Sequence, residues 1–418
     1  MNLHEQIRTL GDNALEASRR LASMSTRRKN IALRAMAAAV DTQRDLIKAA
    51  NDRDLQLGRE AGLSAALLDR LSLTDKRLDG IIRGLRDVAD LPDPVGRCLG
   101  RRRRPNGLVI LKQRVPIGVI VIIYESRPNV TADAAALCVK TGNAVILRGG
   151  KDAYHSNQAL AEALAAGSAE AGLPACAVQC VATTDRDAVR ELVQMDDRVD
   201  LVIPRGGESL IRAVVEQARV PVIKHYKGVC HIYVDESADL DMALAIFENA
   251  KCQRPGVCNA VETLLVHVGI APAFLPQLAE RCRRQHVEVR ADEAACAIVP
   301  DFKPAAEADW GAEYLDRIVA LRVVPDTESA IAHINAYGSR HSDAILTRDE
   351  QAAKAFTREV DSAAVYVNAS TRFTDGGEFG MGAEMGISTD KLHARGPMGL
   401  EELTTYKYVI QGNGQIRA

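Results

Sequence analysis

One cysteine in this sequence stands where a nucleophile would be expected. Cys258 follows the breaker pair Pro255-Gly256, between a helical run that ends near Lys251 and the apolar run 261–266, which is typical of a buried strand. The thiol is therefore predicted to lie on a short loop that rigid neighbours hold and that a small molecule can reach. Cysteine attacks carbon as the thiolate, which backbone N–H groups and nearby cations stabilise. Position alone leaves a second interpretation open, in which Cys258 is a small buried apolar side chain.

Two glycine-containing turns could bind an anion, because each lies between a predicted strand and a predicted helix. The first follows a strand at 144–147 and the second follows a strand at 201–204. Their residues are Arg148, Gly149, Gly150 and Lys151 in the first turn, and Gly206 and Gly207 in the second. Helix N-termini after such turns bind nucleotide phosphates, and the two cations of the first turn could contact a ribose 2′-phosphate, which favours NADP. No useful G-x-G-x-x-G fingerprint is present, and ordinary tight loops contain the same glycines.

Alternating strands and helices are predicted to position these residues. From residue 108, short apolar runs alternate with helical segments, which indicates a parallel, doubly wound sheet; the pattern starts again after a break near residue 221 and continues to about 350. The first 92 residues have the apolar spacing of amphipathic helices, one of them opened by Ser25 or Thr26. The alternating run 404–411 predicts a late strand, which needs an edge to pair with, either the strand near 108–115 or another subunit.

Composition excludes several classes of protein. The 418 residues suit two or three domains, and the net charge of −2 gives no overall attraction to nucleic acid or to an anionic membrane. Nine cysteines, without an apolar export segment at the start, predict a cytoplasmic protein with free thiols. The basic run Arg101–Arg104 is predicted to be a turn before a strand. It could bind an anion or nucleic acid, but a solvated or oligomer-rim cluster explains it better, because no aromatic residues are interleaved.

Motifs spread over nearly the whole chain resemble the aldehyde dehydrogenase superfamily. They are YESRPNV at 124–130, GVCHIYVD at 228–235, QRPGVCNAVETLL at 253–265 and NASTRFTDGGEFGMG at 368–382. The resemblance implies an α/β fold with a Rossmann-type cofactor domain, an α/β catalytic domain and a small β oligomerisation flap. We place the cofactor domain at 1–225, with a strand excursion at about 105–116 that joins the flap. The catalytic domain is expected at 226–360, and a C-terminal return and oligomerisation segment at 361–418.

Within the superfamily, these motifs resemble the enzymes that reduce an acyl phosphate. The substrate implied is L-glutamyl 5-phosphate, the product is L-glutamate 5-semialdehyde, and the pathway is proline biosynthesis. Cys258 would form a thioester as phosphate leaves, and NADPH would deliver hydride. Aldehyde-oxidising members carry a glutamate that activates water, but the corresponding segment 225–231, HYKGVCH, has no carboxylate. A metal site is not expected there, because the cysteine and histidine spacing matches no zinc pattern.

The resemblance also assigns roles to individual residues. Ser126 falls on the side-chain donor of the oxyanion hole, with Asn129 as a competing candidate, and Glu313 falls on the glutamate that binds the nicotinamide ribose. The family's aromatic residue beside that glutamate has become Leu315. The substrate carries a phosphate, a carboxylate and an ammonium. The residues expected to bind it are Arg127, Arg254, Arg372, His341, His393 and, for the ammonium, Glu125. For each arginine alone, a surface ion pair is an equal explanation.

Two other functions stay open at the level of sequence. A CoA-acylating or other semialdehyde dehydrogenase would share Cys258 and lack the water-activating base. A catalytically silent, dehydrogenase-like scaffold protein would differ in the reactivity of its thiol. A small-molecule substrate and a homo-oligomer are expected in any of the enzymatic cases, and glutamate kinase, which supplies the acyl phosphate, is a candidate partner.

Overall fold

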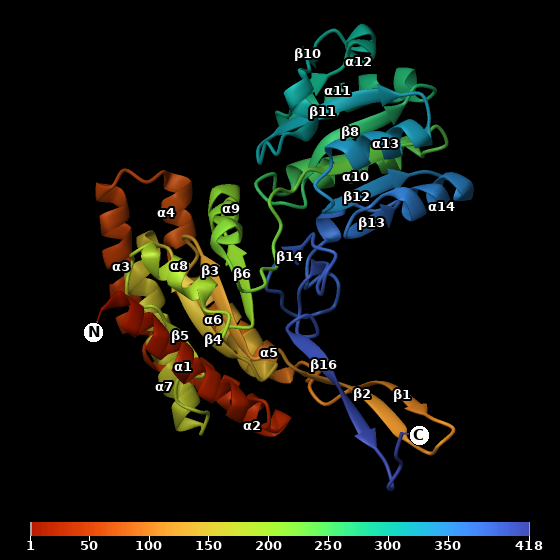
Figure 1. The fold of residues 1–418 in the computed structure, drawn as a ribbon. Helices are drawn as coiled ribbons and strands as arrows, with labels where there is room; N and C mark the ends of the chain where they lie inside the picture. Colours follow the sequence, from red (N-terminus) through yellow and green to blue (C-terminus); the bar gives the residue numbers. More distant parts are fainter. Residues whose placement is uncertain (1, 418) are drawn as a thin grey trace. The chain divides into compact units, whose positions relative to one another are not determined.

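The computed structural model describes residues 2–417, and the chain forms two compact units (Figure 1). The first comprises the chain up to Lys224, Gly380–Gly386 and the stretch from Met398 onward; the second comprises His225–Phe379 and Ile387–Pro397. The segment 361–418, which we expected to be one part of the chain, is thus divided between both units. The cause is strand pairing, since β13 (Ala364–Val367) extends the sheet of the second unit and β16 (Thr404–Gln411) pairs within the first.

The first unit begins with the predicted amphipathic helices. They are α1 (Leu3–Leu21), α2 (Thr26–Thr42), α3 (Arg44–Glu60), α4 (Ala65–Leu71) and α5 (Asp75–Asp90). Ser25 is the N-cap of α2, where its side chain accepts a hydrogen bond from the backbone N–H of Arg28, so the predicted helix start is confirmed. The apolar faces of these helices are buried, with Leu33, Met36 and Val40 of α2 fully enclosed.

A four-stranded parallel sheet follows, in the strand order β5-β4-β3-β6. Its strands are β3 (Val119–Tyr124), β4 (Ala144–Gly149), β5 (Val178–Cys180) and β6 (Leu201–Arg205). The connecting and following helices are α6 (Asn129–Lys140), η1 (Lys151–Ala153), α7 (Tyr154–Glu170), α8 (Asp187–Gln194) and α9 (Glu208–Gln217). Near residue 221, where the strand–helix pattern was expected to start again, the structure has only one isolated bridge, between Val202 and Val222. Because the strand order reverses between β3 and β6, the carboxyl ends of these two strands mark the topological switch point where such sheets bind ligands.

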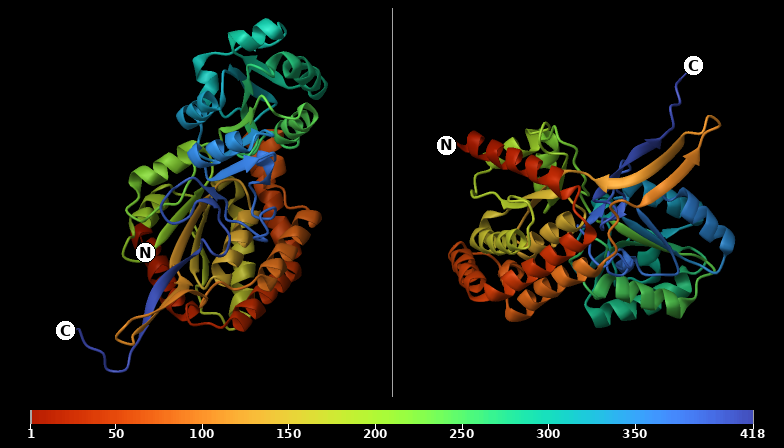
Figure 2. Two further views of the ribbon diagram at one scale, coloured as in Figure 1. Left: turned by 90° about the vertical axis from the view of Figure 1, so that its right-hand side faces the viewer. Right: turned by 90° about the horizontal axis from the view of Figure 1, so that it is seen from below.

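The first unit also contains a three-stranded antiparallel ribbon of β1 (Cys98–Arg103), β2 (Val109–Pro116) and β16. The basic run expected to be a turn is mostly strand β1, because Arg101 to Arg103 pair with residues of β2; the turn comes after it. The late strand β16 pairs with β2 along its whole length, so the intrachain alternative of the prediction is confirmed. Figure 2 shows the three strands side by side in both views.

The second unit is built on a seven-stranded parallel sheet, β10-β9-β11-β8-β7-β12-β13. Its strands not yet located are β7 (Cys230–Val234), β8 (Val261–His267), β9 (Glu288–Ala291), β10 (Lys303–Pro304), β11 (Ile318–Val324) and β12 (Ser342–Leu346). Its helices are α10 (Leu240–Cys252), α11 (Ala271–Gln285), α12 (Glu293–Ile298), η2 (Glu307–Gly311), α13 (Thr327–Tyr337), α14 (Glu350–Glu359) and η3 (Thr371–Phe373). A two-stranded sheet, β14 (Ile387–Ser388) with β15 (Gly396–Pro397), completes the unit.

Each face of this large sheet has its own apolar core. Leu264 and Val266 of β8 join one core with residues of α10 and α11, while Leu265 joins the other with residues of α13 and α14. Neighbouring residues of a strand point to opposite faces, so an uninterrupted apolar run is what a doubly covered strand requires. Val261 and Glu262 at the start of β8 are fully buried, so this end of the preceding loop is anchored in the core.

Candidate active site

Cys258 lies on the loop between α10 and β8, and its side chain is half-buried. The predicted placement on a loop between a helix and a buried strand is therefore confirmed. Lys251 in the last turn of α10 and Asn259 beside the cysteine are buried, so both arms of the loop are held by the fold. The thiol remains partly accessible, as a nucleophile that meets a small molecule must be.

The backbone of Cys258 packs directly against Gly228. A Cβ placed on Gly228 would lie 2.1 Å from the carbonyl oxygen of Cys258 and 2.6 Å from its Cα, so only glycine fits. The N–H of Gly228 donates to Glu313 Oε1 at 2.8 Å. Glu313, predicted to bind the cofactor ribose, thus holds the backbone strip that touches the nucleophile.

A buried polar network supports the loop from behind. The Cys230 thiol donates to the carbonyl oxygen of Cys258 at 3.2 Å and lies 3.7 Å from His341 Nδ1, which is 2.9 Å from Ser342 Oγ. Burial raises the pKa of Cys230 well above its usual value, so it stays a neutral thiol that can donate. His341, expected to bind substrate, is fully buried in this network, where it contacts Cys230.

Arg372 lies beside the Cys258 loop, in the motif that follows β13. Its Nε donates to Gln253 Oε1 at 3.0 Å, and its Nη1 donates to Asn259 Oδ1. Burial, and next the repulsion from Arg254, lower the pKa of Arg372, but a guanidinium keeps its charge at neutral pH. Arg254 itself is exposed on the loop. The sequence-predicted arginines 254 and 372 are therefore close to each other, and together they favour an anionic ligand at this loop.

His231 and His393 have different surroundings. His231 is fully buried, and its backbone N–H and its Nδ1 both contact Asp343 Oδ1, at 2.8 and 2.9 Å, which is a structural role. His393 is exposed between β14 and β15 and has a left-handed backbone with φ of 66°. Within residues 2–417, no group of three His, Cys, Asp or Glu side chains could hold a metal ion.

In the first unit, Glu125 connects the carboxyl ends of β3 and β6. Its Oε2 accepts from the N–H of Gly207 at 2.9 Å, and a Cβ on Gly206 would lie 2.5 Å from the same oxygen. Gly207 is the N-cap of α9. The Glu125 carboxylate therefore lies at the N-terminus of α9, the position where a helix attracts an anion.

The other predicted turn, at the end of β4, is also shaped by glycine. A Cβ on Gly149 would lie 2.0 Å from Asn157 Nδ2. Arg148 is nearly buried and donates to the carbonyl oxygens of Gly149, Thr184 and Asp185 at 2.9 to 3.1 Å. Its guanidinium thus holds the loop after β5, whereas Lys151 is exposed at the start of η1.

Both candidate side-chain donors for an oxyanion hole already have carboxylate partners. Ser126 Oγ donates to Asp152 Oδ2 at 3.1 Å, and Asn129 Nδ2 donates to Asp133 Oδ2 at 3.0 Å. Burial raises the pKa of Asp133 to about 6. Arg127, between the two donors in sequence, is exposed.

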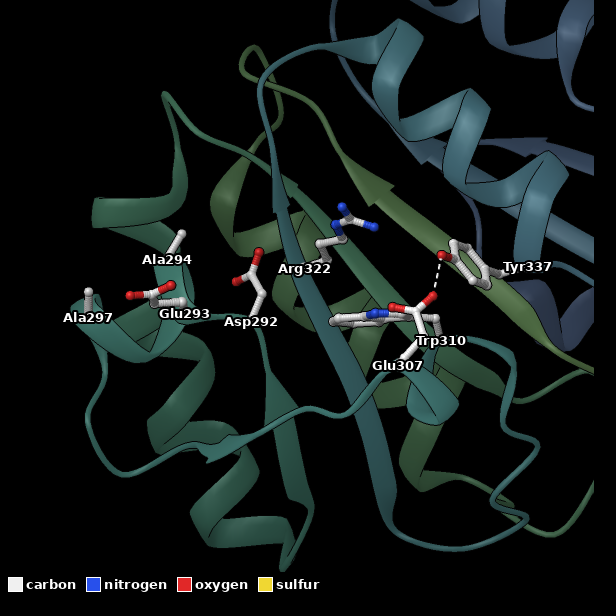
Figure 3. Close-up of a pocket in the computed structure, with 8 residues that line it drawn as sticks. All are labelled: Asp292, Glu293, Ala294, Ala297, Glu307, Trp310, Arg322 and Tyr337. Carbon is white, nitrogen blue, oxygen red and sulfur yellow. Dashed lines mark hydrogen bonds between the residues drawn. The ribbon is translucent and has the colours of Figure 1, made fainter.

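A recess of about 560 Å³ opens in the second unit (Figure 3), but none of its lining residues belongs to the Cys258 loop. Four of its polar side chains have partners: Glu307 Oε1 accepts from Tyr337 at 2.6 Å, Arg322 contacts His333 at 3.1 Å, and Asp292 caps α12. The chain's one tryptophan, Trp310, forms part of the wall. We therefore place the chemistry at Cys258 and not in this recess.

Comparison with known proteins bears on what this geometry is for. The model of the aldehyde dehydrogenase family matches residues 3–306. The chain belongs to the aldehyde dehydrogenase family. Aldehyde dehydrogenases use a nicotinamide cofactor, and the predicted α/β fold of this family is confirmed. No helix in the described part of the chain is both long and apolar enough to cross a bilayer.

Particular aldehyde dehydrogenase relatives are similar over their full length. The gamma-glutamyl phosphate reductase of Moorella thermoacetica is 57% identical over 417 residues, which is 100% of both chains. That of Xanthomonas campestris is 54% identical over 411 residues, 98% of this chain and 99% of the relative. The crystal structure of gamma-glutamyl phosphate reductase from Thermotoga maritima has a TM-score of 0.97 at 49% identity and covers 99% of this chain and 100% of that one. An acetylating aldehyde dehydrogenase from Geobacillus thermoglucosidasius shares the fold, with a TM-score of 0.69 at 18% identity, over 100% of this chain and 98% of that one.

Sequence reasoning gave no role to several residues that hold the nucleophile. Gly228, Asn259 and the buried pair Lys251 and Glu262 were not assigned one. Glu262 had a visible signal, since a charged residue inside the apolar run VETLLV needs a partner when the strand is buried. Gly228 had none, because its need for glycine arises from a contact thirty residues away in the chain.

Proposed function

We propose that this protein reduces L-glutamyl 5-phosphate to L-glutamate 5-semialdehyde in proline biosynthesis and releases phosphate. One observation carries the proposal: in this chain of the aldehyde dehydrogenase family, a partly accessible cysteine packs against Gly228 and lies on the same loop as Arg254, beside Arg372. The full-length similarity to gamma-glutamyl phosphate reductases supports this choice of substrate.

The covalent step is carried by Cys258. Its thiolate sulfur forms a bond to the acyl carbon, and the bond from that carbon to the phosphate oxygen breaks, so phosphate leaves with the electron pair and a thioester remains. Arg254 and Arg372 can attract the phosphate, and the fork of Arg372 can bind two of its oxygens if it leaves Asn259. The nicotinamide cofactor supplies the hydride that turns the thioester into the aldehyde.

Negative charge develops on the acyl oxygen during attack and needs donors. The backbone N–H of Cys258 is the first donor that we propose. Ser126 and Asn129 remain the candidates for the second, and either would have to exchange its present carboxylate acceptor for the substrate oxygen.

The turns of the first unit fit the cofactor. We propose that Gly206 and Gly207 bind the cofactor phosphates at the N-terminus of α9. Lys151 would give the preference for NADP. Gly149 and Gly150 would leave space for the cofactor at the first turn. Arg148 acts indirectly, because its guanidinium organises the loop after β5. Glu125 is better placed to anchor the Gly207 turn than to take a substrate ammonium, which was its predicted role.

A thioester that waits for hydride must not be hydrolysed. The segment 225–231, which lies against the Cys258 backbone at Gly228, carries no carboxylate to activate water. Glu262, four residues after the nucleophile, is fully buried and paired with Lys251, so it does not provide such a base. These features favour reduction of an acyl phosphate over oxidation of an aldehyde to a free acid.

Assembly and location extend the proposal. The ribbon strand β16 carries exposed Tyr406, Tyr408 and Ile410, which supports a homo-oligomer that covers them. Glutamate kinase, whose product this enzyme would consume, stays a candidate partner, and the cytoplasmic location stays a prediction.

The reverse reaction tests the function. The purified protein should reduce NADP with L-glutamate 5-semialdehyde only when inorganic phosphate is present, and it should prefer NADP to NAD. Activity that requires CoA and ignores phosphate would instead identify a CoA-acylating dehydrogenase. Absence of activity together with an unreactive Cys258 thiol would identify a silent scaffold.

A further inference from the structure

A buried ion pair closes the loop that carries Cys258. Lys251 lies in the last turn of α10, before the loop, and Glu262 is the second residue of β8, after it. The Lys251 Nζ is 2.7 Å from Glu262 Oε2, and neither side chain has exposed surface. The pair therefore joins the two ends of the ten-residue segment 252–261 that holds the nucleophile.

Stability alone does not account for such a pair. Moving two charges out of water costs about as much as their attraction returns, so a buried pair is often replaceable by apolar side chains. Burial raises the pKa of Glu262 to about 7 and lowers the pKa of Lys251, which reflects this cost. An ion pair at the two ends of the nucleophile loop therefore indicates a role other than stability.

The second oxygen of Glu262 shows what that role is. Glu262 Oε1 accepts from the backbone N–H of Leu315 at 3.2 Å, and Leu315 has a left-handed backbone with φ of 53°, which is unusual for a leucine. The carboxylate thus holds a turn that no regular element supports. The same turn contains Glu313, which binds the N–H of Gly228 against Cys258. The carbonyl oxygen of Leu315 also lies 3.6 Å from where a Cβ on Gly256 would be, next to the loop itself.

We propose that Lys251 and Glu262 are positioning residues, which fix the Cys258 loop and the 313–315 turn in one arrangement. Lys251 orients the carboxylate, one oxygen of Glu262 closes the loop, and the other sets the turn that presses Gly228 onto the nucleophile. The inference rests on the proposed function only in that Cys258 is the reacting group.

Paired variants separate positioning from stability. The double variant Lys251→Met with Glu262→Leu removes both charges and keeps the volume, whereas Lys251→Met with Glu262→Gln also keeps an acceptor for the N–H of Leu315. Folding is followed by thermal unfolding with Trp310 fluorescence. Positioning is followed by kcat, by KM for phosphate, and by the rate at which iodoacetamide alkylates Cys258, with the exposed Cys98 of the other unit as internal reference.

We expect the variant with Glu262→Leu (the Leu double variant) to have a Tm within a few degrees of wild type. Its kcat and its rate of Cys258 alkylation should each fall at least about tenfold, while the alkylation rate of Cys98 stays unchanged. The Gln double variant should recover part of both losses. Wild-type kcat and alkylation in the Leu double variant would overturn the proposal, and so would failure of both double variants to fold, because the pair would then serve the fold alone. Alkylation needs no substrate, so this result stands apart from whether the proposed substrate is correct.

Discussion

Substitution of Gly228 by alanine should misplace the nucleophile. The new Cβ would lie 2.1 Å from the carbonyl oxygen of Cys258 and 2.6 Å from its carbonyl carbon and Cα, whereas unstrained contacts begin near 3.4 Å. All three are backbone atoms, so no side chain can rotate away. The Cys258 backbone or the 226–229 strip must therefore move by about 1 Å, and a displacement of that size costs on the order of 100-fold in kcat. Overpacking of this kind destabilises a fold by about 1–3 kcal/mol.

The assay measures kcat for phosphate-dependent NADP reduction together with the alkylation rate of Cys258 under native conditions. Both should fall in Gly228→Ala, while KM for the cofactor, which we propose to bind at the turns of the first unit, should stay within about twofold of wild type. Thermal unfolding should remain cooperative, with a lower Tm.

Gly256→Ala is the matched control, because it adds the same methyl group to the Cys258 loop. Its Cβ would meet only the Leu315 carbonyl oxygen, at an ordinary 3.6 Å. We expect kcat and alkylation within about threefold of wild type. If Gly228→Ala is as active as Gly256→Ala, the tight contact does not position the nucleophile and the reasoning fails.

Three further predictions concern charge. The pKa of Asp133 is raised to about 6, so the folded state holds its proton more tightly than the unfolded state and loses stability as the pH rises from about 4 to above 6. Asp133→Asn should therefore raise the free energy of unfolding by about 3 kcal/mol at pH 7.5 and leave it nearly unchanged at pH 4, as chemical denaturation would show. Arg372→Lys keeps the charge but loses the fork, so KM for phosphate should rise roughly tenfold with a smaller change in kcat, and an unchanged KM would exclude the arginine from phosphate binding. Glu125→Gln keeps an acceptor for the Gly207 N–H but removes a negative charge, so the Kd of NADPH should fall roughly threefold by fluorescence titration, and weaker binding would contradict an anion site at this turn.

The sequence predicted well what local pattern determines. The apolar run at 261–266 became β8, the breaker at Pro255-Gly256 became the Cys258 loop, and Ser25 capped its helix, because periodicity, turn residues and caps act over a few residues. The strand order and the division of 361–418 between the units depend on pairings between distant segments, which no local pattern encodes.

The site shows the same limit more sharply. Cysteine chemistry and clustered arginines are visible as residue types, so Cys258, Arg254 and Arg372 could be chosen from sequence. Two other features depend on tertiary contacts alone. The guanidinium of Arg148 donates to backbone carbonyl oxygens, and His341 is buried behind the nucleophile. The prediction of a turn at 101–104 was wrong for most of this run, because pairing with β2 makes residues 101–103 part of a strand.

The most direct test of the account is the mass of the Cys258 peptide during turnover. Enzyme quenched in acid while it oxidises L-glutamate 5-semialdehyde at limiting phosphate should carry a glutamyl thioester on Cys258, and added phosphate should discharge it. The Cys258→Ser variant should carry no such adduct on any of its remaining cysteines and should be inactive. An adduct on Cys252 or another residue, or full activity without a cysteine at 258, would contradict the central claim.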